Sequence, residues 1–244
     1  MTRDELVDQL ASCLDSGDSP WPFLPLCAGN WLTLTRAESL RVLARLAAEQ
    51  AARGEDPIPF HHCVRRLRGM PLPFYEECLL LEGWVDLTGR PSAQGASFGF
   101  VLSSTGCVVL NWRAEEITAL NRRLSLRFAG NEDRASYLRF FSGVAGTADG
   151  RFRIVESESD VGFTSEADET QRASVAARLH PIQIEQVDDS RCTASASLIH
   201  DQQLFAVEFS LLADGSVAMV DDVPLDERLA VQVERLIGPF RIFQ

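Results

Sequence analysis

The side chains best suited to chemistry gather in two short stretches. His61, His62 and Cys63 are consecutive, and Glu76 and Cys78 follow a little further along the chain. If the two stretches form neighbouring strands, alternation places His61 with Cys63, and Glu76 with Cys78, each pair on one face. Imidazole, thiolate and carboxylate groups are the usual ligands of zinc. One hypothesis is therefore an enzyme, or a sensor of a ligand or metal, with its site at these five residues.

Buried thiols beside half-exposed imidazoles are the commoner outcome of such a pattern, and we favour that interpretation. We therefore expect neither a bound metal nor a cofactor. The six cysteines occur singly, without a CxxC pair, so we expect reduced and buried thiols. The motifs GxSxG, HExxH, GxGxxG and the Walker A loop are absent. All 23 residues counted as Lys+Arg are arginine, which excludes a Schiff-base lysine and a phosphate-loop lysine.

Arg65, Arg66 and Arg68 precede the segment 101–106, whose sequence is Val-Leu-Ser-Ser-Thr-Gly. Together they partly resemble the PilZ pattern for cyclic di-GMP, in which an RxxxR element precedes a [DN]xSxxG turn. The arginine spacing departs from RxxxR, and Val101 stands where that family has Asp or Asn, so we do not assign the chain to it. The three arginines remain candidates for binding a phosphate or another anion. The alternative is a solvated strand whose charges protect a sheet edge from pairing.

Negative charge is concentrated in the last third of the chain. The net charge is −12, and residues 1–154 hold 17 arginines against 18 acidic residues, whereas residues 155–244 hold 6 against 17. Such a surface repels nucleic-acid phosphates and anionic lipids, so we expect no nucleic acid and no membrane as partner. We expect the acidic region, with Asp221 and Asp222, to dock on a basic protein surface. Solvation alone is the alternative explanation for this charge.

The hydrophobic periodicity predicts the α+β class. It indicates N-terminal helices, the second of them capped by Thr35 with Glu38 three residues later, and then a central, mostly antiparallel sheet. We expect strands at 60–67, 75–86, 97–103 and 107–111, and a further helix at 131–142. A helix at 171–179 precedes a four-strand meander over 182–220, with Asp214-Gly215 as a turn, and a closing helix is expected from Asp226 to Leu236. A helix with four meandering strands also fits a curved sheet of the cystatin or NTF2 kind.

The expected organisation has three parts. Residues 1–156 form the helical N-terminus and a mixed region, 157–170 form a connector or mobile loop, and 171–244 form an acidic region that can pack with the first part as one domain. The first ten residues carry charges and no apolar run, so we expect neither a signal peptide nor a membrane segment and place the protein in the bacterial cytoplasm. Because no catalytic motif is present, we favour a non-catalytic protein-binding or adaptor module over an enzyme.

Overall fold

The computed structural model of the chain describes residues 8, 10–15, 20–58, 63–86, 95–147, 150–188 and 190–243. Within them, helices and antiparallel strands are mixed, and the α+β class is confirmed. The helix α2 (Arg36–Ala52) begins where expected. The Thr35 hydroxyl oxygen accepts a hydrogen bond from the Glu38 backbone N–H, and the Glu38 carboxylate accepts one from the Thr35 N–H in return. This capping box satisfies two backbone donors that the first helical turn leaves free.

The first sheet contains both the middle and the end of the chain. Its strand order is β1-β2-β3-β4-β14-β13, and β5 also pairs with β4 beside β14. The bounds of its strands are β1 Leu32–Thr33, β2 Cys63–Pro71, β3 Leu79–Asp86, β4 Gly95–Ser103, β5 Gly106–Val109, β13 Glu234–Ile237 and β14 Phe240–Phe243. The hairpin expected around Ser104 and Thr105 joins β4 to β5 and is confirmed. One face of the sheet packs on α2, where Leu43 and Leu46 contact the same core as Phe98 and Phe100.

The second sheet is the expected meander. Its order is β12-β11-β10-β8, and β9 pairs with β10 beside β8. Its strands are β8 Arg153–Ile154, β9 Gln183–Gln186, β10 Arg191–His200, β11 Gln203–Leu212 and β12 Val217–Asp226. Three α-helices complete this half: α4 Ala114–Arg123, α5 Asn131–Val144 and α6 Glu169–Ala176. The short strands β6 (Gly146–Thr147) and β7 (Gly150–Arg151) and the 3-10 turn η1 (Glu158–Asp160) connect α5 to this region.

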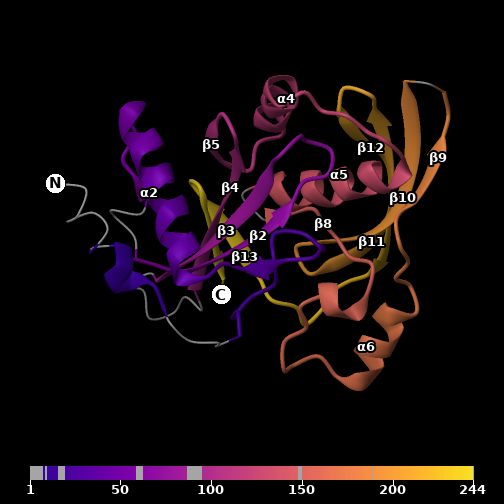
Figure 1. Cartoon of the computed structure of the whole chain (residues 1–244). Coiled ribbons are helices and arrows are strands. Elements are labelled where there is room, and N and C mark those ends of the chain that lie inside the picture. Colours follow the sequence, from indigo (N-terminus) through magenta and orange to yellow (C-terminus); the bar gives the residue numbers. More distant parts are fainter. Residues whose placement is uncertain are drawn as a thin grey trace.

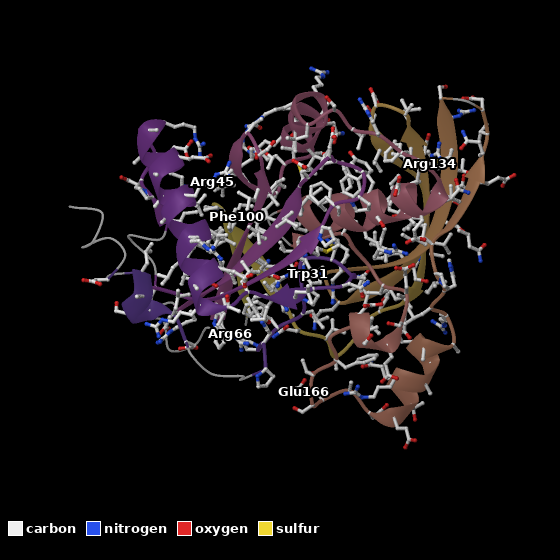
Figure 2. The ribbon with its side chains drawn as sticks, in the orientation of Figure 1. Trp31, Arg45, Arg66, Phe100, Arg134 and Glu166 are labelled. Atoms are coloured by element: carbon white, nitrogen blue, oxygen red, sulfur yellow. The ribbon has the colours of Figure 1, made fainter. Side chains whose placement is uncertain are left out.

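Figure 1 shows α2 and the second sheet on opposite sides of the molecule, with α5 between them. Leu138 and Val144 of α5 belong to the same core cluster as Ala194 and Ala196 of β10. In Figure 2, Phe100 lies beside α2, and Arg134 lies at the end of α5 next to the second sheet. Because α5 covers one face of the meander, the opposite face is left to α6 and to solvent.

The expected closing helix is wrong. Asp226 ends β12, and 234–237 form β13, which turns into β14 so that β14 pairs with β4 of the first sheet. The helical prediction rests on the local sequence, whereas the pairing of β14 with β4 joins residues more than a hundred positions apart. Leu229 and Val231 are buried under α6 together with Val175. As a result, the chain end joins the first sheet.

Part of the segment 157–170 packs against the rest of the protein. Val161 is fully buried, and Phe163 forms a β-bridge with Val231. Ser165, Glu166 and Asp168 are exposed. The division of the chain at this segment, and its mobility, stay predictions.

Candidate functional site

The two cysteines of the alternative Cys/His/Glu site lie at opposite ends of one hairpin. Cys63 begins β2 and pairs with Asp86, the last residue of β3. Cys78 directly precedes β3, next to the far end of β2, where Pro71 pairs with Leu79. Eight residues of strand at about 3.3 Å each separate the two ends by roughly 26 Å.

Cys63 and Cys78 therefore cannot share a site, which corrects the interpretation that neighbouring strands bring them together. Cys78 is buried and Glu76 is exposed. His61 and His62 lie outside the described residues. Antiparallel pairing explains the separation, because each strand residue lies close only to the residues opposite it in the register, and Cys63 lies opposite Asp86.

The three arginines of β2 take three different environments. Arg65 forms ion pairs with Asp86 at 2.6 Å and with Asp15 at 3.5 Å. The guanidinium of Arg66 lies 5.9 Å from the centre of the Trp21 ring. Arg68 is buried and pairs with Glu82. The three arginines therefore have different neighbours, and the phosphate or anion site for which they are candidates stays a prediction.

Arg68 belongs to a buried network of five charged side chains that sequence analysis missed. Glu82 of β3, which is fully buried, accepts hydrogen bonds from Arg68 Nε at 2.8 Å and from Arg241 of β14 at 2.8 Å. Glu234 of β13 lies 3.7 Å from Arg241 and pairs with Arg151 of β7 at 2.6 and 2.9 Å. The sequence could not predict this network, because Glu82 and Arg241 are 159 positions apart.

Backbone carbonyls and aromatic rings complete this network. Arg151 donates to the carbonyl oxygens of Gly143 and Leu26, and Arg241 donates to that of Leu24. The Arg68 guanidinium lies 4.1 Å from the centre of the Trp21 ring and 5.4 Å from that of Trp31. Figure 2 shows Trp31 near the middle of the molecule. The network thus joins the first sheet to β7, to the end of α5 at Gly143 and to the segment 24–26.

The pKa values reflect how strongly these charges are paired. Burial alone would raise the pKa of Glu234, but the attraction of Arg151 and Arg241 outweighs it and lowers that pKa to about 2. Burial lowers the pKa of Arg241 to about 9, and the nearby Arg151 lowers it further while Glu82 and Glu234 oppose the change. Glu234 and Arg241 are therefore charged at neutral pH, and their ion pairs make the network a structural element.

An open acidic surface lies on the second sheet, opposite α5. Residues directly across an antiparallel pair point to the same face, and the registers define one row as Gln183, Ser195, Glu208 and Asp221, and the next as Glu185, Thr193, Ser210 and Ala218. A third row adds Ala206 and Val223. We call these ten residues the acidic face. Its acidic members are Glu185, Glu208 and Asp221, and all three are exposed.

No arginine of the described residues lies within 4.0 Å of a carboxylate oxygen of Glu185, Glu208 or Asp221. Glu208 and Asp221 stand directly opposite one another on β11 and β12. A pair of like charges at this position destabilises a sheet. Exposed apolar side chains flank the face, namely Leu212 and Val223. The acidic face therefore combines small side chains such as Ser195, Ser210 and Ala218 with three carboxylates that have no arginine within ion-pair distance in the described residues.

Asp222 lies on the other side of the sheet from Asp221, because it pairs with Val207, whose side chain is buried in the core. The Asp222 backbone N–H donates to the Asp221 carboxylate at 3.0 Å. Two positions further on, Pro224 has no N–H to offer. The free edge of β12 is thereby protected against adding another strand at these positions. A partner is better bound by the side chains of the acidic face than by this edge.

Two open grooves occur elsewhere on the described surface. One of about 420 Å³ runs between Trp21–Leu24 and Gly162–Ser165, and one of about 510 Å³ lies between Trp112 and Leu236. None of the residues that line them is a histidine or a cysteine. Among the described side chains, no three His, Cys, Asp or Glu residues come together as metal ligands would. The grooves accordingly offer no pairing of a nucleophile with an imidazole base.

Comparisons of the chain with protein-family models, with curated proteins and with solved structures find no match. Within the described residues, no helix has the length and apolar character needed to cross a bilayer.

Proposed function

We propose that the protein is a non-catalytic protein-binding module of the bacterial cytoplasm, and that its acidic face docks on a basic protein surface. The observation that carries this proposal is the cross-strand pair of Glu208 and Asp221. Two opposed carboxylates without a cation cost the fold stability, and a basic partner would remove that cost.

The shape and composition of the face support the same function. Ser195, Ser210 and Ala218 are small, so a partner can approach the strands closely. Leu212 and Val223 at its margin would be covered by the apolar parts of arginine or lysine side chains. Asp222, which points to the other side, would add long-range attraction and no direct contact.

The test compares three forms of the protein as bait for proteins of the source cells. The face variant carries Glu185→Gln, Glu208→Gln and Asp221→Asn. The control variant loses the same charge elsewhere, through Asp56→Asn, Glu76→Gln and Glu115→Gln, which are exposed acids without an ion pair in the described residues. We expect the wild type and the control to capture the same basic protein, and the face variant to lose it.

Association kinetics with the captured protein then test the role of charge. The association rate should fall at least tenfold between low and physiological salt for the wild type and the control. Equal capture by all three forms would contradict the acidic face as the docking surface. Capture of no basic protein at low salt by the wild type would contradict the proposed function altogether.

A further inference from the structure

Two of the six cysteines differ from the rest, and they are neighbours. Cys27, Cys78, Cys107 and Cys192 are buried, with 1 to 4% of each residue exposed. Cys13 and Cys63 are partly exposed. The Cys63 sulfur lies 4.0 Å from the Cys13 carbonyl oxygen, and the Cys13 side chain is one of the groups that raise the pKa of the Cys63 thiol. The chain thus brings together the only two thiols that solvent reaches among the described cysteines.

The surrounding structure holds this pair in place. Residues 10–13 are helical, and Leu10 and Leu14 are buried in the core that α2 forms with the first sheet. The Asp15 backbone N–H donates to the Arg65 carbonyl oxygen at 2.9 Å, which fixes the end of this segment beside β2. Cys13 therefore faces the first residue of β2 from a packed element.

We propose that Cys13 and Cys63 form a reversible disulfide that cross-links the N-terminal segment to β2 when the protein meets a low-molecular-weight disulfide such as glutathione disulfide. The geometry suits a disulfide, because the Cys63 thiol already contacts the backbone of Cys13. The inference is independent of the acidic face, which lies on the second sheet.

The chemistry takes two exchange steps. The Cys13 thiolate attacks one sulfur of glutathione disulfide, the S–S bond of the reagent breaks, and one glutathione thiolate leaves and takes up a proton. The Cys63 thiolate then attacks the Cys13 sulfur of the mixed disulfide and expels the second glutathione. The two protein thiols are oxidised by two electrons, and one glutathione disulfide is reduced to two glutathione thiols.

Cys13 takes the first step because Cys63 is the poorer nucleophile. Burial raises the pKa of the Cys63 thiol to about 12, and contact with the Cys13 thiol adds to the increase. Its thiolate is therefore scarce at neutral pH, and the thiolate is the attacking form. Arg65 favours the Cys63 thiolate and Asp86 opposes it, so these neighbours partly offset one another.

The experiment incubates the reduced full-length protein with glutathione disulfide, removes the reagent and counts free thiols after denaturation. We expect the count to fall from six to four and the mass to fall by two hydrogen atoms. Dithiothreitol should restore all six thiols. The cross-link should raise Tm by at least about 5 °C, because it closes a loop of about 50 residues.

Peptide mapping identifies the linked residues. Trypsin cuts only after arginine in this chain, so Cys63 lies alone in the peptide 54–65, whereas Cys13 shares the peptide 4–36 with Cys27. A second digestion at Asp15 or Asp18 separates Cys13 from Cys27. We expect Cys63 to be linked to the fragment that carries Cys13.

Serine variants provide the controls. Cys13→Ser and Cys63→Ser should each prevent the internal disulfide, while Cys192→Ser should still lose two thiols. Circular dichroism of each variant checks that it folds. A link between any other two cysteines, a stable glutathione adduct on Cys13, or six free thiols after oxidation of the wild type would overturn the proposal.

Discussion

The two charged regions of the molecule are opposites in their environment. In the buried network, Glu82 and Glu234 each contact two arginines, and Arg151 and Arg241 also donate to backbone carbonyl oxygens. On the acidic face, Glu208 faces Asp221 and neither has a cationic neighbour within ion-pair distance in the described residues. In the buried network, each carboxylate is paired with arginines. On the acidic face, the carboxylates of Glu208 and Asp221 have no such partner in the described residues.

This difference separates charges that hold the fold from charges that are available to a partner. A buried charge that loses its partner remains in a medium of low polarity, which is costly. An exposed charge that is removed leaves water in its place, which costs little. The same residue type should therefore give large effects on stability in one region and small effects in the other.

The largest effect is expected for Glu82→Gln. This change leaves Arg68 and Arg241 buried without their shared carboxylate. We expect the free energy of unfolding to fall by about 3 to 5 kcal/mol. Urea denaturation at neutral pH measures the change. A loss below about 1 kcal/mol would show that the two arginines do not depend on this carboxylate.

The network could not have been predicted from sequence, and the acidic face could be predicted in part. The capping box at Thr35, the meander and its turn at Asp214-Gly215 follow from local patterns and are confirmed. The pairing of β14 with β4 depends on contacts between residues more than a hundred positions apart, which no local period encodes. The closing helix was wrong for this reason.

The candidate site shows the same limit. Asp221 was selected from charge alone, and the structure places it on the acidic face. Glu185 and Glu208 were missed, because only the strand register shows that they share a face with it. The register also separates Asp222 from Asp221 and Cys63 from Cys78, although each pair is close in sequence or on neighbouring strands.

A second large effect depends on pH. The arginines around Glu234 lower the pKa of its carboxyl from the ordinary value of 4.5 to about 2. Its pairing therefore stabilises the fold fully above about pH 4.5. This contribution is lost as the pH falls towards 2. The shift corresponds to about 3 kcal/mol. We expect Glu234→Gln to be less stable than the wild type by about that amount at pH 6.

The difference between the two proteins should shrink as the pH falls and be small near pH 2, where about half of the wild-type carboxyls are neutral. Denaturation curves of both proteins from pH 6 to pH 2 provide the measurement. A constant difference across this range would mean that Glu234 acts by its shape and not by its charge.

An intermediate effect is expected where α5 meets the hairpin that carries the acidic face. The Tyr137 hydroxyl donates to the Gly215 carbonyl oxygen at 2.7 Å and accepts from the Asn121 amide at 2.8 Å. Tyr137→Phe leaves both groups without this partner in a buried position, so we expect a loss of about 1 to 3 kcal/mol. Amide exchange at residues 213–216 should also become faster. Unchanged exchange there would show that the hairpin does not rely on this contact.

The smallest effect, and the one with the opposite sign, is expected on the acidic face. Because Glu208 and Asp221 oppose one another across the sheet, Glu208→Gln or Asp221→Asn should raise the free energy of unfolding by a few tenths of a kcal/mol. Either change alone removes the repulsion, so the double variant should gain no more than the better single variant. The gain should shrink in high salt, because exposed charges are screened. A double-mutant cycle by urea denaturation at low and high salt measures these terms. Additive effects, or a loss of stability in each single variant, would mean that the two carboxylates do not repel one another in the folded protein, and the acidic face would lose its strongest support as a docking surface.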